Sequence, residues 1–134
     1  MKGQYLAVEY IFVTGISLVL VLASVSLFNL YREEIIDTTV DGQTDIVAAK
    51  ISVQMHNLDQ MNNGVVEKTV NLPEEMGNRE YDLTLAPPND VIIDVQGTEY
   101  TYEFPSLEEY DFTGTAEGGQ ITLYKNDDQY SIAG

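Results

Sequence analysis

The stretch from Tyr10 to Tyr31 carries no charged side chain and consists largely of Leu, Val, Ile and Phe. A helix rises about 1.5 Å per residue, so a stretch of this length crosses a bilayer core of about 30 Å. Lys2 precedes the stretch and favours a cytoplasmic N-terminus, which places everything after Arg32 outside. The feature therefore predicts one membrane-spanning helix.

A secretory signal peptide is the alternative explanation of this stretch. Its apolar region would span about 7–15 residues and end at a small-residue cleavage site. The segment LASVS resembles such a site, so the alternative stays open. The longer run, which continues into more helical sequence, favours a helix that is retained.

The helical pattern continues beyond the apolar stretch. Residues at three- and four-residue steps share one face, and most of the intervening charges fall on the other side; the members of this stripe are Ile36, Val40, Gln43, Val47, Ile51, Met55 and Leu58. Asn62, Asn63 and Gly64 provide a left-handed C-cap and a turn. We therefore predict one helix from about residue 5 to about residue 60, whose second half needs a cover over its apolar stripe.

After Gly64 the hydrophobic period changes from helical spacing to two. Six or seven short segments alternate in this way, and turn residues such as Pro87 and Pro88 separate them. Short connections favour an antiparallel meander. The predicted fold class is α+β: a long N-terminal helix with a membrane-spanning half and an amphipathic half, packed by a C-terminal antiparallel β-sheet or partial β-sandwich head.

The charge balance limits the kinds of partner. The chain has 22 acidic and 6 basic residues, for a net charge of −16. Such a surface repels nucleic acid and anionic lipid, so neither is an expected partner. Salt screens the self-repulsion, which makes a halophilic source the preferred explanation of the acidity. The absence of cysteine excludes disulfides and thiolate metal sites.

No set of residues predicts catalysis. The single histidine, His56, is expected to be a surface or cap residue, because one histidine without cysteine does not form a zinc site. Asn126, Asp127 and Asp128 fit a turn better than a calcium loop, and Glu108 with Glu109 fits a solvated pair. We expect no enzyme activity, no cofactor and no metal.

Nine tyrosines form the one unusual count in the composition. Tyr81, Tyr100 and Tyr102 fall on inward strand positions. Packing in the core and at its rim, with the hydroxyls reaching the edge, is the favoured explanation. An aromatic adhesive or subunit-contact surface is the alternative.

The N-terminal sequence KGQYLAVEYIFV resembles the class III signal of archaeal type IV pilin-like proteins. That signal has a very short basic leader, a glycine, a glutamine, a glutamate a few residues on, and an apolar helix directly after. The segment TVNLPEEMGNREYDLTL also resembles small pilin-like proteins of salt-loving archaea. The resemblance implies that a prepilin peptidase cuts between Gly3 and Gln4. Glu9 is then the sixth mature residue; the more familiar pilin spacing puts it fifth, which requires a cut after Gln4.

The same resemblance implies a function. The helix would remain on the mature protein and build an extracellular filament, with Glu9 paired to the freed amine of a neighbouring subunit. The implied partners are other copies or related pilins, the peptidase, the pilus assembly machinery and the membrane. The expected parts are a leader (1–3), a membrane or filament-core helix (4–31), its amphipathic continuation (32–63) and the head (64–134). The alternatives are a single-pass anchored exterior binding or sensing domain that does not polymerise, and an archaellum-associated component.

Overall fold

The structure is a computed structural model that describes residues 2–61 and 64–134. Met1, the first residue of the expected leader, and two residues of the expected C-cap, Asn62 and Asn63, lie outside the described residues. The chain divides into two compact units, Met1–Thr38 and Thr39–Gly134.

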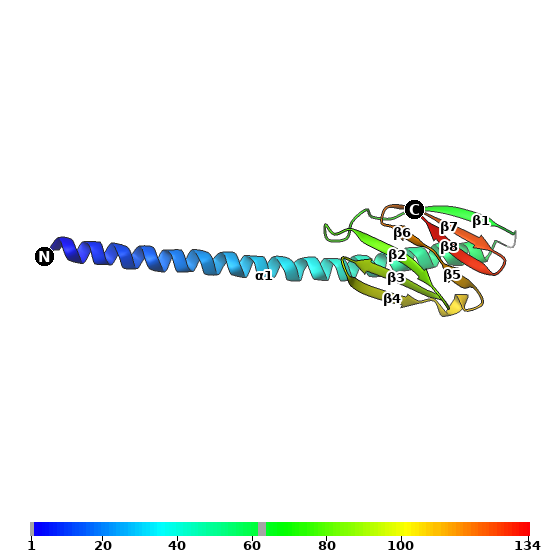
Figure 1. Cartoon of the computed structure of the whole chain (residues 1–134), viewed down its shortest axis with the longest axis horizontal. Coiled ribbons are helices and arrows are strands. Elements are labelled where there is room, and N and C mark those ends of the chain that lie inside the picture. Colours follow the sequence, from blue (N-terminus) through cyan, green and yellow to red (C-terminus); the bar gives the residue numbers. More distant parts are fainter. Residues whose placement is uncertain (1, 62–63) are drawn as a thin grey trace. The chain divides into compact units, whose positions relative to one another are not determined.

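A single helix, α1 (Lys2–Asp59), occupies the N-terminal part of the chain (Figure 1). In the first unit its side chains are exposed, apart from the partly covered Ile36. In the second unit one face is buried, and the buried members are Val40, Thr44, Val47, Ala48, Ile51, Met55 and Leu58. The helix and most of the predicted stripe are confirmed. Ile36 and Gln43 are only partly covered, and Thr44 and Ala48 complete the buried face instead.

The head contains eight strands and one short 3-10 helix, η1 (Pro105–Leu107). The strands are β1 (Val66–Asn71), β2 (Tyr81–Ala86), β3 (Asp90–Val95), β4 (Thr98–Glu103), β5 (Asp111–Thr113), β6 (Thr115–Glu117), β7 (Gln120–Asn126) and β8 (Gln129–Ala133). They form two four-stranded sheets, with orders β1-β7-β8-β5 and β4-β3-β2-β6. Within the second unit, both sheets lie along the C-terminal part of α1 (Figure 1). The α+β class is confirmed, with two sheets rather than one.

A simple meander is not what forms. β2, β3 and β4 follow one another as antiparallel neighbours, but β6 joins the far side of β2 and β1 pairs with β7. β5 runs parallel to β8, which an antiparallel meander does not contain. The prediction of six or seven strands is wrong, because the segment predicted as one short strand forms two strands, β5 and β6.

Gly114 is the point at which that predicted strand divides. β5 before it belongs to one sheet and β6 after it to the other. Gly114 has a φ of 101°, and a Cβ there would lie 2.5 Å from the carbonyl oxygen of Ile132. Only glycine fits a left-handed turn pressed this closely against another strand. The chain therefore switches sheets at this residue.

Alternation along the strands positions the core as predicted. Tyr81, Leu83 and Leu85 are buried along β2, and β3 buries every second residue from Val91 to Val95. The inward residues of both sheets meet the buried face of α1, and the largest fully buried side chains are Tyr130, Phe112, Ile51, Met55, Leu58, Met76, Leu83, Ile93, Leu107, Ile121, Leu123 and Val40. The sheets thus provide the cover that the helical stripe requires.

Candidate functional site

The first candidate site is the exposed start of α1, in the first unit. Gly3, Gln4 and Glu9 lie on the helix, and all three are exposed. Glu9 follows Gln4 by five residues, which is about 500° of rotation and about 7.5 Å of rise. An amine at Gln4 and the carboxylate of the same chain's Glu9 therefore lie on different faces. Nothing in the described residues tests the cut or the pairing of Glu9.

The apolar stretch that follows Glu9 is exposed along its whole length. α1 is the one helix in the described residues that is long and apolar enough to cross a membrane, and its most apolar part is not buried. The exposed large side chains include Phe12, Leu20 and Phe28. A soluble monomer rarely exposes an apolar surface of this extent. The segment therefore needs an apolar environment, which a bilayer or other apolar helices would provide.

Two shallow hollows lie on this stretch and share Ile11 and Gly15. One has a volume of about 360 Å³ and the other about 300 Å³. A Cβ added at Gly15 would meet no atom within 4 Å, so the hollow is open to an incoming group. Small residues on a membrane helix let a second helix approach closely. Gly15 therefore leaves room for a close approach to the helix at this point.

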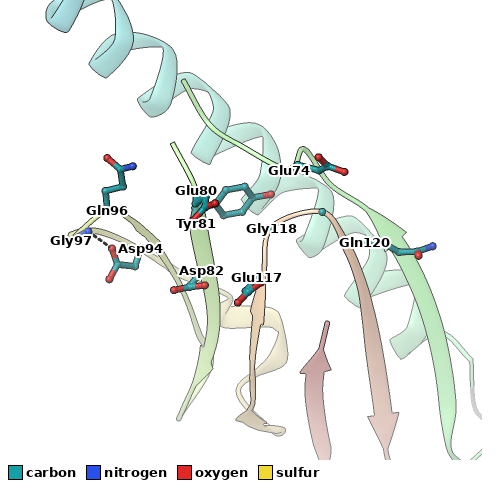
Figure 2. Close-up of a pocket in the computed structure, with 11 residues that line it drawn as sticks. Glu74, Glu80, Tyr81, Asp82, Asp94, Gln96, Gly97, Glu117, Gly118 and Gln120 are labelled. Atoms are coloured by element: carbon teal, nitrogen blue, oxygen red, sulfur yellow. Dashed lines mark hydrogen bonds between the residues drawn. The ribbon is translucent and has the colours of Figure 1, made fainter. Parts of the chain in front are cut away.

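The second candidate site is a cleft of about 580 Å³ on the head (Figure 2). Five carboxylates line it, namely Glu74, Glu80, Asp82, Asp94 and Glu117. The Tyr81 ring crosses it toward Gly118, and a Cβ at Gly118 would lie 2.5 Å from that ring. The Tyr81 hydroxyl donates to the carbonyl of Pro73 at 2.6 Å. Burial raises the pKa of Tyr81 to about 12, and a hydrogen bond with the Gly119 backbone opposes the shift.

Strand register places four carboxylates in one row across the sheet that borders this cleft. Glu99 lies opposite Asp94, Asp94 opposite Asp82, and Asp82 opposite Glu117. Figure 2 shows Asp82 and Glu117 on adjacent strands. Like charges directly opposite one another destabilise a sheet. We name these residues the acidic row: Glu99, Asp94, Asp82 and Glu117. Sequence reasoning missed it, because it depends on strand register.

The cleft has little chemistry beyond negative charge. Asp94 accepts a hydrogen bond from the Gly97 amide at 2.7 Å, which is a turn contact (Figure 2). Among the described residues, no group of three or more His, Cys, Asp or Glu side chains is arranged to hold a metal ion. The arrangement repels anions. The absence of enzyme activity stays a prediction.

Two of the three tyrosines predicted to point inward bind the helix. Tyr81 is buried, and Tyr100 and Tyr102 are partly buried. Tyr100 donates to Asp41 at 2.8 Å, and Tyr102 donates to Asp45 at 2.7 Å. Burial raises the pKa of Tyr102, and the nearby carboxylates contribute in the same direction. Packing at the rim of the core is therefore confirmed, with hydroxyl–carboxylate bonds that hold β4 against α1.

A buried lysine holds the C-terminal end of α1. The Lys125 ammonium donates to the carbonyls of Leu58 at 3.2 Å and Asp59 at 3.3 Å, and lies 3.7 Å from the Asp59 carboxylate. It also lies 5.5 Å from the centre of the Tyr110 ring. Helix carbonyls at this end lack intrahelical partners, and a cation stabilises them. Alternation along β7 places Lys125 on the same inward face as Ile121 and Leu123. This pattern could have indicated a buried lysine, but the sequence analysis missed it.

Tyr110 and Tyr130 complete this cluster. Tyr110 donates to the Asp59 carboxylate, and Tyr130 donates to the Met55 carbonyl at 3.0 Å. The hydrogen bond to Asp59 is the largest cause that raises the pKa of Tyr110 to about 12. Burial is the largest cause that raises the pKa of Tyr130 above its ordinary value. The cluster is a structural anchor for the helix end.

The remaining sequence candidates lie on the surface. His56 is exposed, and its Nε2 lies 3.2 Å from the Gln60 amide nitrogen. Asn126 accepts from the Asp127 amide at 2.8 Å in the turn between β7 and β8, as expected for a turn. Glu108 and Glu109 are exposed just after η1. Within the part of the chain that the structure describes, none of these residues lines the cleft on the head.

Comparison of the chain with protein-family models, with curated proteins and with solved structures finds no match.

Proposed function

We propose that this protein is a pilin-like structural subunit that is processed by a prepilin-type peptidase and assembles into an extracellular filament through its N-terminal helix. The observation that carries the proposal is a long exposed apolar helix, α1, that contains a carboxylate, Glu9, near its start. A plain anchor needs an apolar stretch but does not need a carboxylate at its edge. Burial of that carboxylate among helices is costly unless it is paired.

The geometry around Glu9 supports a partner on another subunit. After a cut between Gly3 and Gln4, the new amine and the same chain's Glu9 would lie on different helix faces. A neighbouring copy, displaced along the helix axis, can place its amine against Glu9. The alternative cut after Gln4 would leave Tyr5 and Glu9 four residues apart on one face, where they can pair within the chain. The first cut therefore suits assembly better.

The rest of the proposal concerns location and partners. Before assembly, the chain spans the membrane once with its N-terminus in the cytoplasm, and afterwards it lies in a filament at the cell surface. Other copies or related pilins, the peptidase and the assembly machinery are its partners. The acidity of the head, at −16 for the whole chain, suits a high-salt exterior.

The role of Glu9 is tested with Glu9→Gln in cells that express the full chain. Glutamine keeps the size of the side chain but removes the charge that would pair with an amine. We expect filament incorporation to fall by at least about tenfold, since losing a paired buried charge costs several kcal/mol. Ser17→Ala, a neutral change on the same helix, is the control. Unchanged incorporation of the Glu9 variant would leave an anchored exterior domain as the better account.

A further inference from the structure

The second unit has an exposed apolar face on α1 that the sheets do not cover. Ile46 is 67% exposed and Val53 is 56% exposed, and Gly42 and Ala49 beside them are also exposed. Val53 follows the buried Ile51 by two residues, which is about 200° around the helix. The head therefore covers one face of the helix and leaves the opposite one open. We name this face the outer stripe: Gly42, Ile46, Ala49 and Val53.

The outer stripe has the spacing of a coiled-coil seam. Its members follow one another at steps of four, three and four residues, which places Ile46 and Val53 at a positions and Gly42 and Ala49 at d positions. Large and small side chains alternate along it. Two identical stripes therefore fit one another, because the small residues leave room for close approach and the large residues fill the space. The stripe carries no charge, although the chain as a whole has a charge of −16.

The charges that flank the stripe favour a second copy in one register. Asp45 occupies a g position and Lys50 the e position of the next heptad. In a parallel pair of helices at the same height, a g residue lies against that e residue of the partner helix. Asp45 already accepts a hydrogen bond from Tyr102, and Lys50 already donates to the Asn71 carbonyl. A carboxylate accepts several hydrogen bonds and an ammonium donates three, so both can also pair with each other across two copies.

From these observations we infer that two copies of this chain associate as a parallel, in-register pair through the outer stripe, with Asp45 of each copy against Lys50 of the other. A two-fold axis along the pair makes the contact isologous, so both Asp45–Lys50 pairs form at once. Four stripe residues bury less area than a standard interface. Membrane insertion compensates for this, because it gives both copies the same direction and depth. The inference rests on that insertion and does not require filament assembly.

Disulfide cross-linking tests the pairing, since the natural chain has no cysteine. Full-length chain with Ala49→Cys is reconstituted into zwitterionic phospholipid vesicles at a low protein-to-lipid ratio and oxidised. The control is Thr101→Cys, at an exposed position on β4. We expect the Ala49 variant to form several-fold more covalent dimer than the control. Equal yields, or no dimer from the Ala49 variant, would overturn the inference.

Charge reversal tests the register. In the Ala49→Cys background at low salt, Lys50→Glu should reduce the dimer yield several-fold, and addition of Asp45→Lys should restore it. A double variant that stays as low as the single one overturns the assigned register. Ile46→Glu changes an exposed side chain, so it should leave the melting temperature unchanged and still reduce the yield, which separates pairing from folding. Cross-linking needs no leader cleavage, so its outcome is independent of the mature mass that tests the proposed function.

Discussion

Lys125→Met removes the cation that holds the end of α1 while it keeps most of the side chain's apolar stem. The ammonium makes two hydrogen bonds to helix carbonyls and one ion pair with Asp59. Each hydrogen bond to a charged group contributes about 1.5–3 kcal/mol, but the variant no longer has to desolvate an ammonium. We expect a net loss of about 2–3 kcal/mol in the free energy of unfolding of the head.

The measurement is thermal or denaturant unfolding of the full chain in detergent, with tyrosine fluorescence as the signal that monitors unfolding. A loss of this size lowers the melting temperature by about 10–20 °C for a unit of this length. Lys68→Met, at a half-exposed position of β1, is the matched control and should change it by no more than about 3 °C. A Lys125 variant as stable as the control would refute the view that this lysine caps the helix.

Three further predictions concern the head. Asp82→Asn, in the middle of the acidic row, should raise stability at low salt by about 0.5–1 kcal/mol, with a smaller gain at high salt and none for Asp127→Asn, as measured by denaturant unfolding. Gly114→Ala should destabilise the head by more than about 2 kcal/mol, clearly more than Gly97→Ala, which has a similar positive φ but no atom within 4 Å of the added Cβ. The pKa of Tyr110 rises from 10.0 to about 12 on folding, so its contribution to stability should be full below pH 10 and be lost as the pH rises through 12. Tyr110→Phe should flatten that alkaline loss in melting curves, and an unchanged pH profile would contradict the assignment.

Local patterns were sufficient for the helix and for most strands. The step from helical spacing to alternation after Gly64 needs only neighbours in the sequence, and the buried residues of β2 and β3 follow from it. The buried face of α1 was predicted at five of its members, which leaves Thr44 and Ala48 unpredicted. Small side chains at those two positions carry a weak hydrophobic signal, and only the packing of the sheets buries them.

Features that depend on the tertiary arrangement were not predictable. The acidic row exists because β6 pairs with β2 across a long connection, which the sequence order does not indicate. The division at Gly114 and the parallel pairing of β5 with β8 have the same origin. Alternation with Ile121 and Leu123 indicates that Lys125 points inward, but it does not indicate which groups the ammonium binds. Its role emerges only where β7 meets the end of the helix.

The role assigned to the N-terminus came from a short motif, which the structure describes but does not test. Gln4 and Glu9 lie on α1 as expected, and the helix also includes Lys2 and Gly3 of the expected leader. The most apolar part of α1 is not buried within the described residues. A bilayer anchor and a filament core both require such exposure. Removal of the leader is the property that distinguishes the two functions.

The mass of the mature protein, purified from its native cells, shows whether the leader is removed. We expect a chain that begins at Gln4 and lacks the three leader residues, in material that sediments as filaments. A protein that keeps Met1, Lys2 and Gly3 would refute the proposed processing and leave α1 as a membrane anchor for an exterior domain.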